Sequence, residues 1–338
     1  MKLTYQQLAS AVSGAVRTWE GEDGFHACRF TQEQTDAYSI RREDFHRKAL
    51  SASGIVIRFR TDSPSLKLSV TVHSGSSRKY FGVDLLVEGR YVDSLKNFED
   101  PAFGTHYVGM EAAMGDFSKE FELGPGEKNV ALYLPWSVEC VISALELADG
   151  ATFAPVKREK KLLAFGDSIT QGYDALMPHR KYITRLADYL GMEEINKAIG
   201  GEIFWPELAS MGDDFQPELI TVAYGTNDWT NRPYAEFQAA SRAFYENLRK
   251  TYPNAPIFAL TPVWRKDSIH QSRNYESIHQ AEELIRQAVE GLPNITVIRG
   301  WEMIPQEEAL YADLNLHPND EGFLHYYENL AKSLEGRV

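Results

Sequence analysis

A serine, an amide side chain and a histidine occur in this sequence at places that would suit acyl transfer. An apolar run ends in Gly166-Asp167-Ser168, within LLAFGDSITQG. Asn227 follows another apolar run, in LITVAYGTNDW, and His317 lies in YADLNLHPNDEG, just before a helical stretch. A histidine can take the proton of a serine hydroxyl near neutral pH, because its unperturbed pKa is about 6.5. The pattern therefore indicates Ser168 as a nucleophile and His317 as its base.

Acyl transfer also needs hydrogen-bond donors for the negative oxygen of its tetrahedral intermediate. The backbone N–H groups of Ser168 and Gly201 and the side-chain amide of Asn227 are three candidate donors. Gly201 lies in NKAIGGE, where a glycine lets the backbone approach a substrate closely. Losing one such donor typically raises the activation barrier by ~3 kcal/mol, so these residues should matter more for rate than for folding.

The order of strands and helices predicts how these residues meet. Apolar strand candidates lie at 161–165, 193–198, 218–223, 256–261 and 294–299. Helical stretches lie around 233–250, 274–290 and 319–334. This alternation predicts a three-layer α/β/α domain with a parallel sheet, in which ligand sites gather at the carboxyl ends of the strands. Each candidate residue follows such a strand end or precedes the last helix, so we expect them at one edge of the sheet.

The first 150 residues have the pattern of an all-β region. In SLKLSVTVHS (65–74) apolar and polar residues alternate, as in a strand with one face toward solvent. Other short strand candidates lie at 53–62, 82–95 and 117–136, and 97–116 is interpreted as a loop. We predict a β-sandwich, jelly-roll-like, as an accessory domain over residues 1–152. After a linker rich in Gly, Pro and charge, the second domain would cover residues 153–338.

Composition excludes several classes of protein. The formal net charge of the 338-residue chain is −13, and the short KREKK at 157–161 is its main basic run, so no nucleic-acid partner is expected. The N-terminus lacks the apolar core of a signal peptide, and no apolar stretch is long enough to span a bilayer; we expect a cytoplasmic protein without a membrane partner. The sequence contains no metal-binding spacing and no nucleotide-binding loop, so no metal and no cofactor are expected.

Four blocks of the sequence carry a family resemblance. FGDSITQG, NKAIGGE, YGTND and LHPND resemble, in order, the four sequence blocks of the SGNH hydrolases, also called the GDSL esterase/lipase family. The resemblance covers about residues 160–335 and implies a flavodoxin-like α/β domain. It implies Ser168 as nucleophile, Gly201 and Asn227 as oxyanion donors and His317 as base. A β-domain followed by such a domain is similar to carbohydrate-esterase-like and SsfX3-like members.

One position departs from the family pattern. The last block usually reads Asp-x-x-His, but here Leu314 stands three residues before His317, and Asp313 lies one position farther back. A small backbone bulge would bring Asp313 to the ring and complete a triad. A backbone carbonyl that holds the ring N–H would instead give a Ser-His dyad. Asp313 is the only carboxylate in the eight residues before His317, which favours the acid.

Four further residues near the blocks are candidates for binding substrate. They are Trp205, Trp229, Trp264 and Arg265. Core packing is the equal alternative for each tryptophan, and a surface cation is the alternative for Arg265. Asp167 is interpreted as a structural residue that stabilises the turn and the start of the helix.

The predicted function is that of a serine esterase. It would hydrolyse short-chain acyl esters, acetyl esters above all, of a carbohydrate or small metabolite through an acyl-enzyme. An acyltransferase with the same site is one alternative, because both reactions need the same serine, base and oxyanion donors. A catalytically inert carbohydrate-binding protein is the other.

Overall fold

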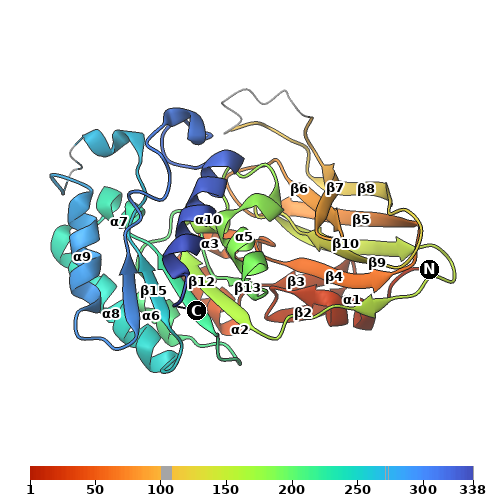
Figure 1. Ribbon diagram of the computed structural model, residues 1–338, viewed down its shortest axis with the longest axis horizontal. Helices are drawn as coiled ribbons and strands as arrows, with labels where there is room; N and C mark the ends of the chain where they lie inside the picture. Colours follow the sequence, from red (N-terminus) through yellow and green to blue (C-terminus); the bar gives the residue numbers. More distant parts are fainter. Residues whose placement is uncertain (100–108, 271, 273, 338) are drawn as a thin grey trace.

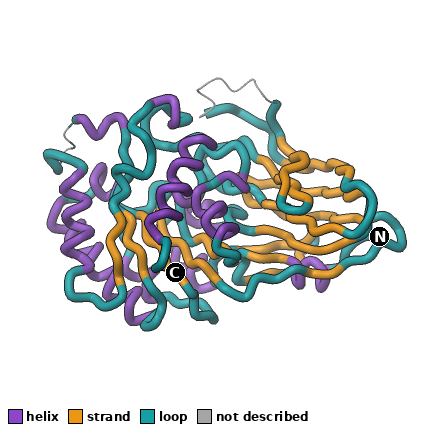
Figure 2. Tube along the Cα trace, viewed as in Figure 1, coloured by secondary structure: helices purple, strands orange, loops and turns teal. Residues whose placement is uncertain are grey.

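A computed structural model describes residues 1–99, 109–270, 272 and 274–337; positions 100–108 of the predicted loop lie outside these ranges. Antiparallel strands form the N-terminal half and a parallel sheet between helices forms the C-terminal half (Figure 1). Figure 2 shows how the strands of the two halves meet in the middle of an elongated molecule.

Two antiparallel sheets make up the N-terminal half, as predicted for a sandwich. The first has the order β1 (Val12–Ser13), β4 (Val56–Thr61), β9 (Lys128–Tyr133), β6 (Gly82–Val87) and β7 (Arg90–Lys96), with β11 (Ala154–Pro155) on β4. The second has the order β2 (Arg17–Gly21), β3 (Gly24–Cys28), β10 (Val138–Leu147), β5 (Ser65–Ser74) and β8 (Gly115–Glu122). The apolar residues of β5 are buried in the core between the sheets, and the intervening residues are half-buried or exposed. The period-2 pattern is thus the pattern of burial.

Three helices in the first 50 residues were not predicted. They are α1 (Tyr5–Ala11), α2 (Gln32–Arg41) and α3 (Glu43–Ala49). Thr4 and Thr31 begin α1 and α2 with capping boxes, in which the threonine side chain and a glutamine three residues on each satisfy a backbone N–H. Tyr38 of α2 and Phe45 of α3 join the apolar core of the α/β half, not that of the sandwich.

The C-terminal half is a three-layer α/β/α domain, as predicted. Its five strands pair in parallel in the order β13 (Glu193–Asn196), β12 (Lys161–Gly166), β14 (Leu219–Ala223), β15 (Ile257–Leu260) and β16 (Ile295–Ile298). This is the flavodoxin-like order. Leu162, Leu163, Ala164 and Phe165 of β12 are all buried, because helices cover both faces of a parallel sheet.

The helices divide between the two faces of this sheet. Helices α6 (Pro206–Ser210), α8 (Tyr234–Thr251) and α9 (His279–Val289) pack on one face, and α5 (Tyr182–Tyr189) and α10 (Asp320–Leu334) on the other. Short helices α4 (Ser168–Gln171) and α7 (Thr226–Asn231) follow β12 and β14. Single 3-10 turns cover Pro178–Arg180, Lys266–Ile269 and Glu308–Leu310.

A buried arginine fastens the two halves together. Arg29, just after β3, is fully buried and donates to the carbonyl oxygens of Asn196 and Ala198, both at 2.7 Å. It also donates to the carbonyls of Lys48 (2.7 Å) and Ser51 (2.9 Å). Burial lowers the pKa of Arg29 to about 10, which still leaves it charged at neutral pH. The predicted boundary between residues 152 and 153 stays a prediction, and this contact crosses it.

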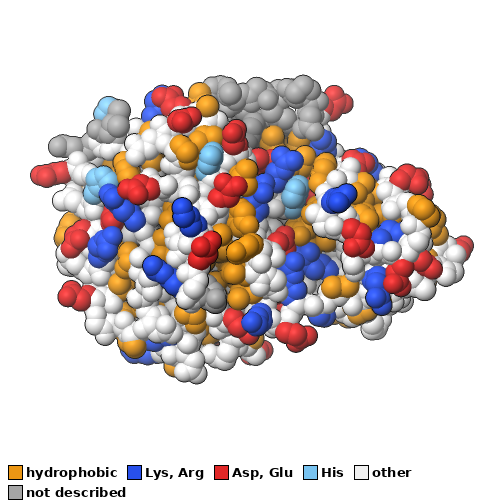
Figure 3. Space-filling view, in the orientation of Figure 1, with side chains coloured by type: hydrophobic (Ala, Val, Ile, Leu, Met, Phe, Trp, Pro, Cys, Tyr) orange, Lys and Arg blue, Asp and Glu red, His pale blue; other side chains and the backbone are white. Residues whose placement is uncertain are grey.

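The surface carries both signs of charge. On the face shown in Figure 3, acidic and basic side chains are interspersed over both halves. Within the described ranges, no helix combines the length and the apolar composition needed to cross a membrane.

Replacing Arg29 with methionine should lower the free energy of unfolding by ~3 kcal/mol or more, because four carbonyl oxygens in the interior lose their donor. Denaturant unfolding followed by circular dichroism measures the change. Arg60→Met, which removes an equally charged but exposed side chain, is the control and should stay within ~0.5 kcal/mol of the wild type. Equal unfolding midpoints for the two variants would contradict the structural role of Arg29.

Candidate active site

Ser168 begins helix α4 at the carboxyl end of strand β12. The preceding residue, Asp167, caps this helix, and its side chain accepts a hydrogen bond of 3.0 Å from the N–H of Ile169. A Cβ on Gly166 would lie 2.3 Å from Oγ1 of Thr170, so a side chain at that position would force the turn to open. The Gly-Asp-Ser sequence therefore builds a tight strand-to-helix turn with the serine at its apex.

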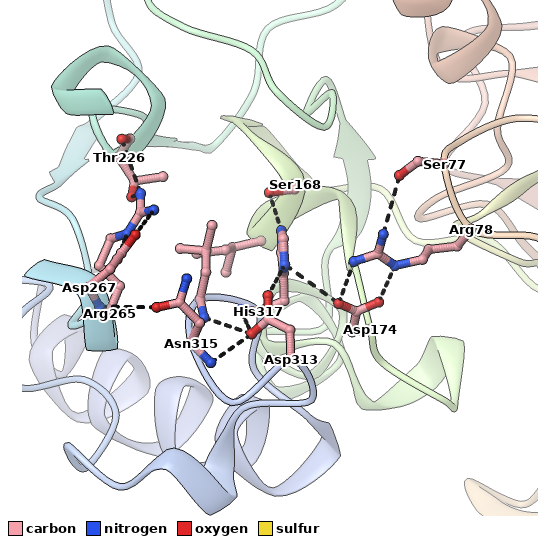
Figure 4. Close-up of polar contacts among 12 residues, drawn as sticks. Ser77, Arg78, Ser168, Asp174, Thr226, Arg265, Asp267, Asp313, Asn315 and His317 are labelled. Atoms are coloured by element: carbon pink, nitrogen blue, oxygen red, sulfur yellow. Dashed lines mark hydrogen bonds and ion pairs between the residues drawn. The ribbon is translucent and has the colours of Figure 1, made fainter. Parts of the chain in front are cut away.

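The structure brings Ser168, His317 and Asp313 into one hydrogen-bonded chain (Figure 4). Oγ of Ser168 lies 2.9 Å from Nε2 of His317, and Nδ1 of the same ring lies 2.7 Å from Oδ2 of Asp313. An ionised carboxylate only accepts hydrogen bonds, so Nδ1 carries the ring hydrogen and Nε2 is the acceptor for the serine hydroxyl. This is the tautomer that a general base needs.

The extra residue between Asp313 and His317 is accommodated by the backbone. Leu314 has a φ of +55°, in the left-handed region, and the turn that it forms points the Asp313 side chain back over the following residues. Oδ1 of Asp313 accepts from the N–H groups of Asn315 (3.0 Å), Leu316 (2.7 Å) and His317 (3.0 Å). One oxygen thus fixes the loop while the other meets the imidazole.

The carboxyl group of Asp313 is held ionised by its surroundings. Burial alone would raise its pKa. The hydrogen bond and charge of His317 and the backbone N–H groups outweigh that effect and hold the pKa of Asp313 well below its usual range. The residue is therefore a carboxylate over the whole pH range in which a histidine can act as a base.

The three candidate oxyanion donors lie on loops fastened to one another. The N–H of Ile199 donates to the carbonyl of Gly166 (3.1 Å), and Nδ2 of Asn227 donates to the carbonyl of Glu202 (3.0 Å). Gly201 lies between these two anchors with a φ of +87°, which favours glycine. Among the described residues, no protein atom accepts a hydrogen bond from the N–H of Gly201.

The candidate substrate-binding residues lie in different environments. Trp229 and Trp264 are buried in the cores on the two faces of the sheet. Arg265 is also buried, and its guanidinium is engaged by both carboxylate oxygens of Asp267 and by Oγ1 of Thr226 (Figure 4). Trp205 is half-buried, with the guanidinium of Arg41 4.3 Å from its ring centre. Core packing thus accounts for two of the tryptophans, and Trp205 is the one with an accessible surface.

A second carboxylate near the histidine was missed by the sequence analysis. Oδ2 of Asp174 lies 3.5 Å from Nδ1 of His317. Asp174, Asp313 and His317 together offer a donor set that could in principle hold a metal ion. Both carboxylates, however, are engaged by protein donors: Asp174 by Arg78 and Asp313 by three backbone N–H groups and the ring. The arrangement suits proton transfer better than cation binding.

A known family matches part of the chain. Residues 164–323 match the GDSL-like Lipase/Acylhydrolase family. This family is also known as the SGNH hydrolases; the matched region lies in the α/β half, and the chain has in addition an N-terminal β-sheet region. A comparison with curated proteins gave no significant match.

Several solved structures share the fold over most of the chain. One is the salicylyl-acyltransferase SsfX3 from a tetracycline biosynthetic pathway, 20% identical, with a TM-score of 0.78 over 96% of this chain and 94% of that one. Another is a putative GDSL-like lipase from Bacteroides ovatus, also 20% identical, with a TM-score of 0.77 over 99% and 97%. An acetyl xylan esterase, Est2A, from the rumen bacterium Butyrivibrio proteoclasticus is 16% identical, with a TM-score of 0.60 over 85% and 91%. At these identities the likeness establishes the fold.

The buried acid of the turn should make stability depend on pH. Burial raises the pKa of Asp167 to about 6, although the N–H of Ile169 opposes the shift. As the pH rises from about 4 to about 6, the unfolded chain releases this proton before the folded protein does, so the wild type loses stability in that window. Asp167→Asn keeps an acceptor for Ile169 and has no proton to lose. Denaturant unfolding at pH 4.5, 5.5 and 7 should show that the free energy of unfolding of the variant rises relative to that of the wild type as the pH rises. A difference between the two free energies that does not change with pH would contradict the raised pKa of Asp167.

Proposed function

We propose that the protein is a serine esterase that hydrolyses short-chain acyl esters, acetyl esters above all, of a carbohydrate or small metabolite. The observation that carries the proposal is the unbroken chain of hydrogen bonds from Oγ of Ser168 through His317 to Asp313. An isolated serine is a weak nucleophile, and a base on its hydroxyl oriented by a third group is what activates it.

In the first half of the reaction the serine attacks the ester carbonyl carbon. As the bond from Oγ to carbon forms, the hydroxyl proton moves to Nε2 of His317, and Asp313 stabilises the imidazolium. The carbonyl oxygen becomes an oxyanion, for which the N–H groups of Ser168 and Gly201 and the amide of Asn227 are the proposed donors. The Asn227 amide has two N–H bonds, so one can hold the Glu202 carbonyl while the other serves the oxyanion. Collapse of this intermediate releases the alcohol, which takes the proton from His317.

In the second half the acyl group leaves the serine. His317 removes a proton from a water molecule, which attacks the acyl-enzyme carbonyl. The new tetrahedral intermediate uses the same donors, and its collapse returns the proton to Oγ of Ser168 and releases the carboxylic acid. No step needs a group other than side chains, backbone N–H groups and water.

The proposed substrate class is supported by the family and by the neighbours in fold. The family is one of lipases and acylhydrolases, and an acetyl xylan esterase shares the two-part architecture. A family 2 carbohydrate esterase from Clostridium thermocellum, of the same fold, was solved with cellohexaose bound. The half-buried Trp205 is the candidate surface for a sugar ring or acyl group.

Acyl transfer to an alcohol is the second candidate function. It is favoured by the likeness to SsfX3, which extends over almost all of both chains and includes the sandwich. The transferase differs from the esterase only in the molecule that attacks the acyl-enzyme. The third alternative is a catalytically inert binding protein. It is disfavoured by the hydrogen-bonded alignment of Ser168, His317 and Asp313, which binding alone does not require.

The triad is tested by substitution with an aryl acetate as substrate. Ser168→Ala and His317→Ala should abolish turnover above background, and Asp313→Asn should lower it on the order of 10⁴-fold, because the ring loses the acceptor that fixes its tautomer. Glu308→Gln, an exposed carboxylate in the same segment, is the matched control and should behave as the wild type. A serine-directed phosphonate should label Ser168 in the wild type and in Glu308→Gln, and should not label Ser168→Ala. An Asp313→Asn variant with most of its activity would contradict the triad.

The reaction type is tested with a panel of acyl donors. Acetyl, butyryl and longer aryl esters and acetylated sugars are incubated with and without an alcohol acceptor, and the products are separated by chromatography. We expect the acetyl donors to react fastest, with the free acid as main product and with no effect of a metal chelator. Acylated alcohol as the main product would establish the transferase instead. Loss of activity with chelator and its return with a divalent ion would contradict the serine mechanism.

A further inference from the structure

The catalytic histidine faces two carboxylates, one from each side of its Nδ1 atom (Figure 4). Asp313 lies at 2.7 Å and accepts the ring hydrogen, and Oδ2 of Asp174 lies at 3.5 Å. The Asp174 side chain is fully buried. Its φ of +70° is unusual for a residue with a side chain and fixes the carboxylate in this turn after α4. A buried charge this close to the ring acts on it through a medium of low dielectric constant.

The N-terminal half supplies the groups that hold Asp174. Arg78 donates to both carboxylate oxygens, from Nε to Oδ1 at 2.6 Å and from Nη2 to Oδ2 at 2.9 Å. The hydroxyl of Tyr80 donates to Oδ1 at 2.7 Å. Both residues lie in the segment between β5 and β6 of the sandwich. The bidentate pairing fixes the position of the carboxylate as well as its charge.

Arg78 is also linked to His317 through the aromatic ring of Tyr173. Its guanidinium lies 5.3 Å from the ring centre of Tyr173, and that ring stacks on His317 with centres 5.6 Å apart. Burial would lower the pKa of Arg78, but its hydrogen bonds and the charge of Asp174 raise it, so the group stays cationic. The sandwich thus places one fixed positive charge behind the second carboxylate.

Several polar and charged groups surround the imidazole ring of His317. The described groups that face His317 are the hydroxyl of Ser168, the carboxylates of Asp313 and Asp174, the ring of Tyr173 and, farther away, the buried Asp167. Asp313 favours the imidazolium, as the reaction requires. Asp174 adds a second negative charge close to the ring. The guanidinium of Arg78 offsets that second negative charge.

We propose that Arg78 is a positioning residue of the active site: by pairing with Asp174 it limits the negative charge at His317 and so sets the lowest pH at which the base works. The inference rests on the proposed function, since it concerns the base of that reaction. It also gives the sandwich a part in catalysis that does not depend on contact with substrate.

The test is the pH dependence of kcat/KM in two variants with opposite expected shifts. Arg78→Met removes the positive charge and leaves the carboxylate, so the acid limb of the profile should move to higher pH by about one unit. Asp174→Asn removes the negative charge and leaves the guanidinium, so the limb should move to lower pH. Asparagine tolerates the left-handed backbone of this position. A loss of packing alone would move neither limb in a charge-dependent direction.

Two further variants control for charge and for structure. Arg78→Lys keeps the positive charge and should leave the limb near that of the wild type. Lys79→Met removes the neighbouring cation, which is exposed and pairs with Glu111, and should not move it. Circular dichroism and thermal unfolding show whether each variant is folded. An Arg78→Met enzyme with an unmoved limb, or shifts of the same sign in Arg78→Met and Asp174→Asn, would overturn the proposal.

The protonation of the His317 ring can be measured without an activity assay. An NMR titration of the histidine signals, with His317→Gln to assign the ring, should show the same opposite shifts in the two variants. Failure of the proposed function would appear as absence of serine-dependent turnover with these shifts intact. Failure of the present proposal would appear as an active esterase whose His317 titration does not respond to Arg78.

Discussion

The hydrogen bond between Asp313 and Nδ1 of His317 decides which ring nitrogen can take a proton, and the remainder of the site is arranged around it. The other oxygen of Asp313 accepts from three consecutive N–H groups, which restrict rotation of the carboxylate and hold it in place for this bond. The loop, in turn, needs Leu314 in a left-handed conformation. The left-handed backbone of Leu314, the turn closed by Asp313 and the fixed tautomer of His317 thus all serve one requirement, which is a carboxylate held against Nδ1.

The second requirement is that the nucleophile and its donors stay at one edge of the sheet. Ser168 is held by the short turn after β12, whereas Gly201 lies on a longer loop after β13. That loop is fastened from the N-terminal half: Arg29 binds the carbonyls of Asn196 and Ala198, and Nζ of Lys48 donates to the carbonyl of Gly200 at 2.7 Å. The Gly200 carbonyl and the Gly201 N–H belong to the same peptide bond, and in a trans peptide they point in opposite directions. The hydrogen bond from Lys48 to this carbonyl therefore also sets the direction of the Gly201 N–H.

The parts of the fold that repeat a local pattern could be predicted from the sequence. The strands of the parallel sheet and the alternating face of β5 follow from hydrophobic periodicity, and the positions of Ser168 and His317 follow from their places after a strand and before a helix. Helices α1 to α3 are too short for a clear period, although Thr4 and Gln7, and Thr31 and Gln34, carried a capping signal. Arg78 and Asp174 are 96 residues apart, and nothing local marks either one. Contacts of that kind depend on how the two halves pack against each other. A short stretch of sequence carries no information about that packing.

The fully buried guanidinium of Arg29 has a consequence for how such a protein can change over generations. Its donors are satisfied by backbone carbonyls from both halves, so exchange of the C-terminal half for an unrelated one removes the carbonyls of Asn196 and Ala198 and leaves those of Lys48 and Ser51. A recombination event at the linker would leave a buried cation with only part of its hydrogen bonds. Exchange of one half should therefore destabilise the protein, and substitution in surface loops is the less costly route to a new specificity.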